Sequence, residues 1–218
     1  MSQPYYPSLN RPTDGYLFVV TYGLSGDVAL QSVLNAIPGL CIRGENAETG
    51  GLLAEAWAAL ESVDPATPDG FMRDTRLGWA LADAFTETVL SPPKGVRVAG
   101  FREIRWPEDP VRFAQRLDFL YSFFPGTRFV FNTRNHADVA ASGWWAQQDP
   151  EQVAAQLRKQ DENFDAYVQR WPGRGVRVHF DDYASDPAVL TDLFKSLDAD
   201  ADIQGLHQKL RDAVAGMA

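Results

Sequence analysis

The sequence predicts an α/β fold of three layers, in which a mostly parallel sheet of about five strands lies between two layers of helices. Two observations predict it. Short apolar runs rich in β-branched and aromatic residues recur at 16–22, 39–44, 95–101, 128–133 and 175–180. Longer segments between them repeat their apolar residues at helical spacing. Short buried strands that alternate with helices are typical of parallel sheets covered on both faces.

Helices are expected between these strands. The helical pattern covers residues 27–37, 52–60, 111–124, 137–147 and 151–171. In parallel α/β sheets, ligands bind beyond the carboxyl ends of the strands, where loops lead into helices. A ligand site is therefore expected among the loops that follow the first four strands.

Length and composition predict one soluble domain. The 218 residues suit a single domain over residues 16–218, preceded by a flexible arm over residues 1–15. The single cysteine, Cys41, excludes a disulfide scaffold and favours the cytoplasm. No apolar run approaches the roughly 20 residues that span a bilayer, so no membrane association is expected. The net charge of −9 argues against nucleic-acid binding.

The charge is distributed unevenly along the chain. Residues 94–134 hold eight basic and four acidic side chains, so this segment carries +4 and the rest of the chain carries −13. A solvated basic face and a binding site for an anion explain this segment equally well.

The first loop has the features of an anion site. The run "YLFVVTY" enters the turn "GLSG", residues 23–26, and a helix follows directly. The free N–H groups of a helix N-terminus bind anions without help from side chains. The turn lacks the Lys and the hydroxyl of a Walker loop, which argues against an ATP or GTP hydrolase. Asp27 opens the helix; it is a good N-cap, but its carboxylate competes with an anionic ligand for the same donors.

A second signal follows the fourth strand. Arg134 stands just past the strand end, and Ser142 lies eight residues further on. A guanidinium and a hydroxyl that converge suit a phosphate monoester, because the guanidinium binds two oxygens at once. Taken singly, Arg134 is better explained by a surface ion pair, and Ser142 by close packing.

Together the two loops resemble a known family. The ordered motifs "TYGLSG", "LNAIPGLCIRGEN", "FREIRW", "FPGTRFVFNTRNHADVAASGWW" and "VHFDDYASDPAVLTDLFKSL" are similar to those of the sulfotransferases that use 3′-phosphoadenosine 5′-phosphosulfate, and the short bacterial members resemble the chain most. The resemblance covers roughly residues 16–200 and implies a P-loop-like sulfotransferase fold.

The resemblance also implies ligands and roles. The 5′-phosphosulfate of the co-substrate would be wrapped by the loop Gly23, Leu24, Ser25, Gly26, Asp27 and Val28. Arg134 and Ser142 would hold its 3′-phosphate. Glu45 and Glu103 are candidates to deprotonate a hydroxyl or amine of a small-molecule or glycan acceptor. Part of the acceptor site is expected in the segment between Ala47 and Pro92, and no metal is expected.

Three positions of the loop depart from the family pattern. Typical members have Lys or Arg at the position of Leu24, and Ser or Thr at those of Asp27 and Val28. The cation neutralises charge on the leaving oxygen, and loss of one such donor typically costs about 10² to 10³ in rate.

Three hypotheses follow from these departures. The chain is a working sulfotransferase whose cation comes from Arg43, Arg102 or Arg105. Alternatively, it has lost donor binding and acts as a binding or accessory protein. In the third, it catalyses a different reaction that uses Asp27 as an acid, a base or a metal ligand.

The two glutamates also have structural interpretations. Glu45 follows the second strand in "RGENAETGG", where it is a base at the sheet edge, a solvated loop acid or a helix cap. Glu103 lies between Arg102 and Arg105, and a structural ion pair with one of them is the favoured interpretation. A carboxylate serves as a base near neutral pH when burial raises its pKa.

Overall fold

The computed structural model describes residues 5–61, 76–197 and 202–216. Its centre is a five-stranded parallel sheet with the strand order β2-β3-β1-β4-β5. The strands are β1 (Gly15–Val20), β2 (Leu40–Arg43), β3 (Val98–Glu103), β4 (Arg128–Thr133) and β5 (Gly175–His179). The predicted α/β class and the five predicted strands are confirmed.

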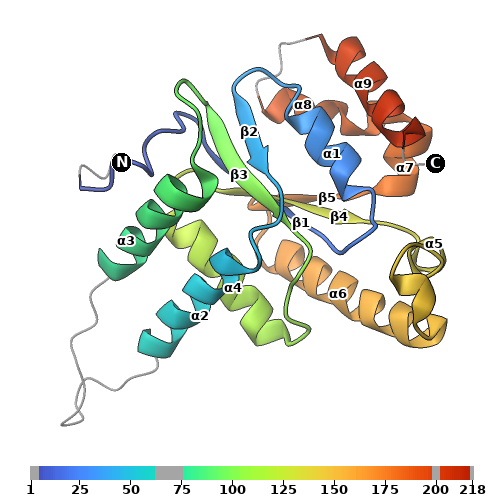
Figure 1. The fold of residues 1–218 in the computed structure, drawn as a ribbon, viewed down its shortest axis with the longest axis horizontal. Coiled ribbons are helices and arrows are strands. Elements are labelled where there is room, and N and C mark those ends of the chain that lie inside the picture. Colours follow the sequence, from blue (N-terminus) through green and yellow to red (C-terminus); the bar gives the residue numbers. More distant parts are fainter. Residues whose placement is uncertain (1–4, 62–75, 198–201, 217–218) are drawn as a thin grey trace.

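Helices cover both faces of this sheet (Figure 1). One face carries α1 (Asp27–Leu34), α7 (Phe180–Ser185), α8 (Thr191–Ser196) and α9 (Ile203–Ala215), with the 3₁₀ turn η3 (Pro187–Leu190). The other carries α3 (Arg76–Phe85), α4 (Pro110–Phe123) and α6 (Pro150–Arg170), with α2 (Thr49–Glu61) packed on α4. The remaining elements are the π-helical turn η1 (Thr86–Leu90), α5 (His136–Ala140) and the 3₁₀ turn η2 (Trp145–Gln147).

The side chains of the central strand alternate between two cores. Leu17 and Val19 pack into the core under α1 and α9, whereas Phe18 and Val20 pack into the aromatic core under α4 and α6. All of β1 is buried. A strand that is buried on both faces reads as a continuous apolar run, which is why the pattern predicted it clearly.

Strand register brings the ends of three strands together. Val20 at the end of β1 pairs with Glu103 on β3 and with Phe131 on β4. Because β3 and β4 lie on opposite sides of β1, the strand order reverses here. Ligands of open α/β sheets bind at such reversal points. β3 also ends later than the predicted strand 95–101, so Glu103 is a strand residue.

Local signals explain where the helices on the ligand side begin. The carboxylate of Asp109 accepts from the Arg112 N–H at 2.8 Å at the start of α4. Asp149 caps α6 in the same way, and a proline opens each of these helices. In contrast, Gly26 occupies the N-cap of α1 with φ +80°, and no side chain caps that helix.

Two predicted segments differ from the structure. The predicted helix 137–147 is broken, because Gly143 has φ +46° and separates α5 from η2. Ser142 therefore lies after α5. The predicted acceptor region between Ala47 and Pro92 forms α2, α3 and η1, and its residues 62–75 lie outside the described part of the chain.

The N-terminal segment packs against α3 where it is described. Residues 1–4 of the predicted arm lie outside the described residues. Ser8 and Leu9 are buried, and the Leu9 N–H donates to the Asp83 carboxylate at 2.9 Å. The Tyr16 hydroxyl donates to the Leu9 carbonyl at 3.1 Å. No helix in the described part of the chain is long and apolar enough to cross a membrane.

Candidate functional site

The loop between β1 and α1 has a constrained backbone. Leu24 has φ +66° and Gly26 has φ +80°. A Cβ on Gly26 would lie 1.9 Å from the Phe180 ring, so only glycine fits there. The left-handed conformation costs a non-glycine residue such as Leu24 roughly 1–2 kcal/mol. Tertiary contacts must therefore hold this loop in its shape.

Those contacts come from four side-chain donors, and each binds one carbonyl oxygen of the loop. The donors are Trp145 Nε1 to Gly23 O (3.2 Å), Arg134 Nη1 to Leu24 O (3.0 Å), Asn132 Nδ2 to Ser25 O (3.0 Å) and the Tyr183 hydroxyl, whose single proton is shared between Gly26 O (3.3 Å) and Asn132 Oδ1 (2.9 Å). The carbonyl oxygens of the loop are thus all engaged with β4, η2, α7 and the turn that follows β4.

The N–H groups of the same loop, in contrast to its carbonyl oxygens, are unpaired in the described part of the chain. Within the described residues, the N–H groups of Gly23, Leu24, Ser25 and Gly26 have no hydrogen-bond acceptor. Three of these residues are buried, and buried N–H groups without a partner are rare. Together with the positive end of α1, they form an array of donors suited to an anion.

A buried polar cluster supports the loop from below. Asn132 is completely buried and donates to Ser25 O and to Ser25 Oγ at 2.9 Å. Its own Oδ1 accepts from the Tyr183 hydroxyl at 2.9 Å. The Thr21 hydroxyl donates to the Asn132 carbonyl at 2.9 Å. Asn132 was not among the residues predicted from the sequence; the signal that points to it is an amide side chain at the end of an otherwise apolar strand.

Asp27 does not cap α1. Asp27 is 3% exposed, and its carboxylate forms an ion pair with Arg102, which is 75 residues away in the sequence. Burial raises the pKa of Asp27, and the charge of Arg102 opposes that rise. Because Arg102 neutralises the carboxylate, much of the repulsion between Asp27 and an anion in the loop is offset.

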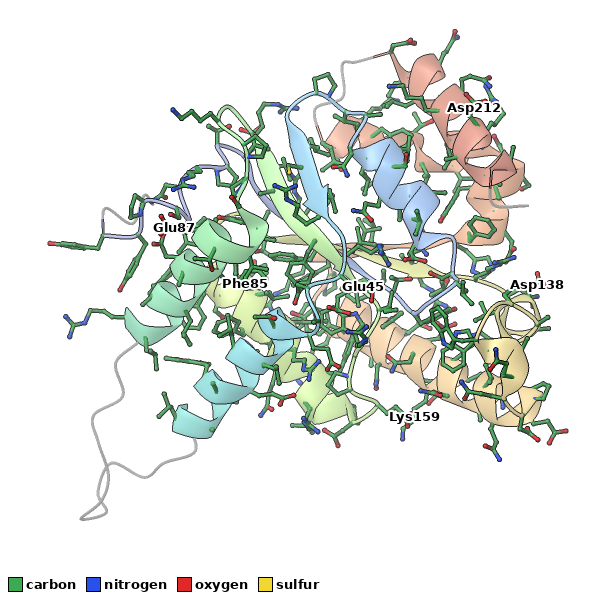
Figure 2. The ribbon with its side chains drawn as sticks, viewed as in Figure 1. Glu45, Phe85, Glu87, Asp138, Lys159 and Asp212 are labelled. Atoms are coloured by element: carbon green, nitrogen blue, oxygen red, sulfur yellow. The ribbon has the colours of Figure 1, made fainter. Side chains whose placement is uncertain are left out.

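The ion pair continues into a chain of charges across the sheet edge. Arg102 also donates to Gln31 Oε1 at 3.0 Å and to Glu45 Oε1 at 3.4 Å. Glu45 Oε2 lies 3.4 Å from Arg105. Figure 2 shows Glu45 near the centre of the molecule, between α1 and the helices of the opposite layer. The structure thus brings Asp27 and Glu45 together around Arg102.

Glu103 serves the backbone. It is 3% exposed, and its two carboxylate oxygens accept from four N–H groups, of Asn46, Glu48, Ile104 and Arg105, at 2.9–3.4 Å. It shapes the loops after β2 and β3. The structure gives it neither of the predicted ion pairs, with Arg102 or Arg105.

Arg134 stands beside the loop without a carboxylate partner in the described part of the chain. Besides the bond to Leu24, its guanidinium lies 4.8 Å above the Phe180 ring. Its Nε is buried and has no hydrogen-bond partner among the described residues. Its backbone N–H donates to the Tyr22 hydroxyl at 2.9 Å.

The other cations around the sheet are neutralised or directed elsewhere. Ion pairs join Arg97 to Asp14, Arg102 to Asp27, Arg105 to Glu45, Arg112 to Glu55, and Arg116 to Glu48 and Glu55. Arg43 donates to the carbonyls of Leu90 and Ser91, in and after η1. The positive segment 94–134 is therefore largely compensated, and among the described residues Arg134 is the cation beside the loop that lacks an acidic partner.

The remaining residues of the predicted site are Ser142, Leu24 and Val28. The Ser142 hydroxyl donates to the Asp138 carbonyl at 2.6 Å, so it is engaged within its own turn. Leu24 turns its side chain toward Gly143, where an added Cβ would lie 2.7 Å from Leu24 Cδ1. Val28 is 57% exposed. The flanks of the loop are thus apolar.

A cavity of about 690 Å³ opens beside the loop. Its walls come from the loops after β1, β2 and β3, from α4 and α6, and from Trp144 and η2. They comprise Tyr22, Gly23, Glu45, Glu48, Ile104, Arg105, Trp106, Pro107, Arg112, Arg116, Trp144, Trp145, Gln156, Leu157 and Gln160. Trp144 packs against Gly23, where an added Cβ would lie 2.2 Å from its ring. The anion loop and this cavity therefore share a border.

Across residues 5–61, 76–197 and 202–216, no group of three or more His, Cys, Asp or Glu side chains lies close enough to hold a metal ion.

Comparisons with known proteins identify a distant structural neighbour. Neither a family model nor a curated protein sequence matches the chain. A solved structure that matches is the crystal structure of retinol dehydratase in complex with androsterone and inactive cofactor PAP. The two are 17% identical; the match covers 96% of this chain and 66% of that one, with a TM-score of 0.47. A likeness this distant assigns neither a family nor a ligand to the chain.

Proposed function

We propose that the protein binds 3′-phosphoadenosine 5′-phosphosulfate at the β1–α1 loop and transfers its sulfuryl group to a hydroxyl or amine of a small molecule or glycan. One observation carries the proposal. The four loop carbonyls are engaged by side-chain donors, while the N–H groups of the same residues have no acceptor in the described part of the chain. The sequence motifs of the sulfotransferases support the choice of this nucleotide.

The proposed roles follow from the contacts. The N–H groups of residues 23–26 bind the 5′-phosphosulfate, and Arg134 binds the 3′-phosphate. Ser142 joins Arg134 once its hydroxyl leaves the Asp138 carbonyl. Asp27 is a positioning residue that fixes Arg102 next to Glu45. Glu103 positions the backbone of the cavity wall.

The chemical step requires one base and one cation. The acceptor oxygen or nitrogen attacks sulfur, and the bond from sulfur to the bridging phosphate oxygen breaks. Glu45, which lines the cavity next to the loop, takes the acceptor proton. The leaving oxygen keeps the electron pair, and 3′,5′-diphosphoadenosine departs. We assign the neutralising cation to Arg105, whose side chain is 51% exposed and lines the same cavity; proton uptake by Glu45 removes the charge that pairs with Arg105 at 3.4 Å and so frees the guanidinium for the leaving oxygen.

A second candidate function is nucleotide binding without transfer. The apolar flanks of the loop favour it, because Leu24 packs on Gly143 and the exposed Val28 offers no hydroxyl. An assay with isotopically labelled donor and a mixture of acceptors separates the two functions. Labelled product supports transfer; nucleotide binding without any labelled product supports the second candidate.

Replacement of Arg134 by alanine should weaken the binding of 3′,5′-diphosphoadenosine about 10- to 100-fold, because charge-assisted hydrogen bonds to the phosphate are lost. Isothermal titration calorimetry measures the effect. Arg128→Ala is the matched control, since Arg128 also donates to a carbonyl, that of Ser196, but lies at the opposite end of β4. Equal weakening in both variants, or no heat at millimolar nucleotide with the unmodified protein, would contradict the donor site.

A further inference from the structure

The cavity beside the loop has charged walls that are already neutralised. Arg105 pairs with Glu45 at 3.4 Å, and Arg116 pairs with Glu48 at 3.3 Å. The third arginine, Arg112, pairs at 2.7 Å with a carboxylate just outside the lining. An anionic ligand would have to displace the glutamates, and a cationic ligand would have to displace the arginines. Neither gains a free counter-charge, so the walls favour a neutral ligand.

A purely apolar ligand is disfavoured for a different reason. Five charged side chains line this cavity, and an apolar molecule would remove their water without replacing its hydrogen bonds. Such desolvation of charged groups costs several kcal/mol per ion. A ligand with many hydroxyl groups avoids this cost, because each hydroxyl both donates and accepts.

The aromatic residues offer ring faces. The indole N–H of Trp106 donates to the Glu103 carbonyl at 2.8 Å, and that of Trp145 donates to the Gly23 carbonyl at 3.2 Å. Both rings are thereby fixed by the backbone. Trp144 is 47% exposed and lies 6.1 Å from Trp145, centroid to centroid. The electron-rich faces of such rings attract the positive edge of a neighbouring group, such as the C–H face of a sugar.

The amide oxygen of one glutamine on the cavity wall accepts no hydrogen bond from the described residues. Gln160 is 6% exposed, and its Nε2 donates to the Trp106 carbonyl at 3.0 Å. Its Oε1 is buried and has no hydrogen-bond partner among the described residues. Unpartnered buried acceptors are costly, and a hydroxyl group of a ligand would satisfy this one.

We propose that this cavity binds a neutral, polyhydroxylated ligand of the size of a mono- or disaccharide. Its volume lies within the range of small-molecule sites. As the acceptor site of a sulfotransferase, it rests on the proposed function, and one sugar hydroxyl then meets Glu45 beside Gly23. Sugar binding itself does not depend on that reaction.

The test titrates the full-length protein with maltose and cellobiose, with glucuronic acid and glucosamine as charged analogues and 2-naphthol as the apolar probe. Concentrations up to about 50 mM cover the millimolar affinities typical of small neutral ligands. The indole N–H signals of Trp106, Trp144 and Trp145 in ¹H–¹⁵N spectra are the readout, and Trp171, which lies outside the cavity lining, is the reference. At least one disaccharide should shift the cavity signals and bind about tenfold more tightly than the charged analogues.

Two variants sharpen this test. Gln160→Leu should weaken sugar binding about three- to tenfold, as expected for one lost hydrogen bond. Gln115→Leu, which alters a separate groove between α4 and α6, should leave it unchanged. The inference is overturned if neither disaccharide shifts the cavity signals, or if 2-naphthol or a charged analogue binds more tightly.

The same titrations separate the two proposals when they are repeated with 3′,5′-diphosphoadenosine. Sugar binding without nucleotide binding refutes the proposed function and leaves the ligand class standing. Nucleotide binding without sugar binding refutes the proposed ligand class and leaves the proposed function standing.

Discussion

Replacement of Arg102 by methionine is expected to lower the free energy of unfolding by about 3–5 kcal/mol at neutral pH, because it leaves a buried carboxylate without its counter-ion. The side chain of Asp27 is 5% exposed, and that of Arg102 is 11% exposed. In the variant, the remaining donor from a neighbouring side chain is the Ser25 hydroxyl at 3.4 Å. Chemical denaturation followed by circular dichroism measures the loss.

The loss should depend on pH in a defined direction. The pKa of Asp27 is already raised by burial above its ordinary value of 3.8, and removal of Arg102 raises it further. A raised carboxyl pKa in the folded state gives stability that is present at low pH and is lost as the pH rises through that pKa. The penalty of Arg102→Met is therefore largest near neutral pH and shrinks toward pH 4.

Controls isolate the buried pair. Lys159→Met removes an exposed ion pair with Glu108 and should change stability by about 0–1 kcal/mol. The double variant Asp27→Ser, Arg102→Met should recover most of the loss, because no uncompensated charge remains. A loss below about 1 kcal/mol for Arg102→Met, or a loss that does not change with pH, would show that the pair is not the buried unit described above.

Replacement of Asn132 by leucine should damage both the fold and the anion loop. The change leaves Ser25 O without its donor and removes an acceptor from the Tyr183 hydroxyl. At about 1–3 kcal/mol for the unsatisfied Ser25 O and about 0.5–1.5 kcal/mol for the lost bond to Tyr183, which keeps Gly26 O as an acceptor, the free energy of unfolding should fall by about 2–4 kcal/mol. Because the Ser25 peptide is then free to turn, nucleotide binding should weaken more than tenfold, as measured by calorimetry.

Asn163→Leu is the matched control for this prediction. Asn163 is also buried, at 6% exposed, and donates one hydrogen bond, to the Glu108 carbonyl at 3.0 Å, far from the loop in sequence. The Asn163→Leu variant should be less stable than the unmodified protein but should bind the nucleotide with the same affinity. If the two variants bind the nucleotide equally well, the side-chain support of the loop is not what shapes the anion site.

The fold could be predicted from the sequence because its signals are local. The strands are continuous apolar runs, and Pro110 and Pro150 mark helix starts within one turn. The broken helix after His136 was missed because the pattern of apolar residues continues through Gly143, and only the backbone shows its left-handed conformation.

The hydrogen-bond and ion-pair partners within the site, in contrast, come from residues that are distant in the sequence. The glycines of the loop and Arg134 were visible in the sequence, but the ion pair of Asp27 joins residues that are 75 positions apart. An acid after a glycine turn reads equally well as a helix cap, so no local pattern predicts its partner. The structural role of Glu103 likewise follows from backbone N–H groups in two loops.

We propose above that the N–H groups of Gly23, Leu24, Ser25 and Gly26 bind an anionic ligand. ¹H–¹⁵N spectra of the labelled protein, recorded during titration with 3′,5′-diphosphoadenosine and with adenosine as the uncharged control, test it directly. We expect downfield shifts of these four amide protons with the diphosphate and none with adenosine. Equal shifts with both ligands, or diphosphate shifts confined to other amides, would contradict it.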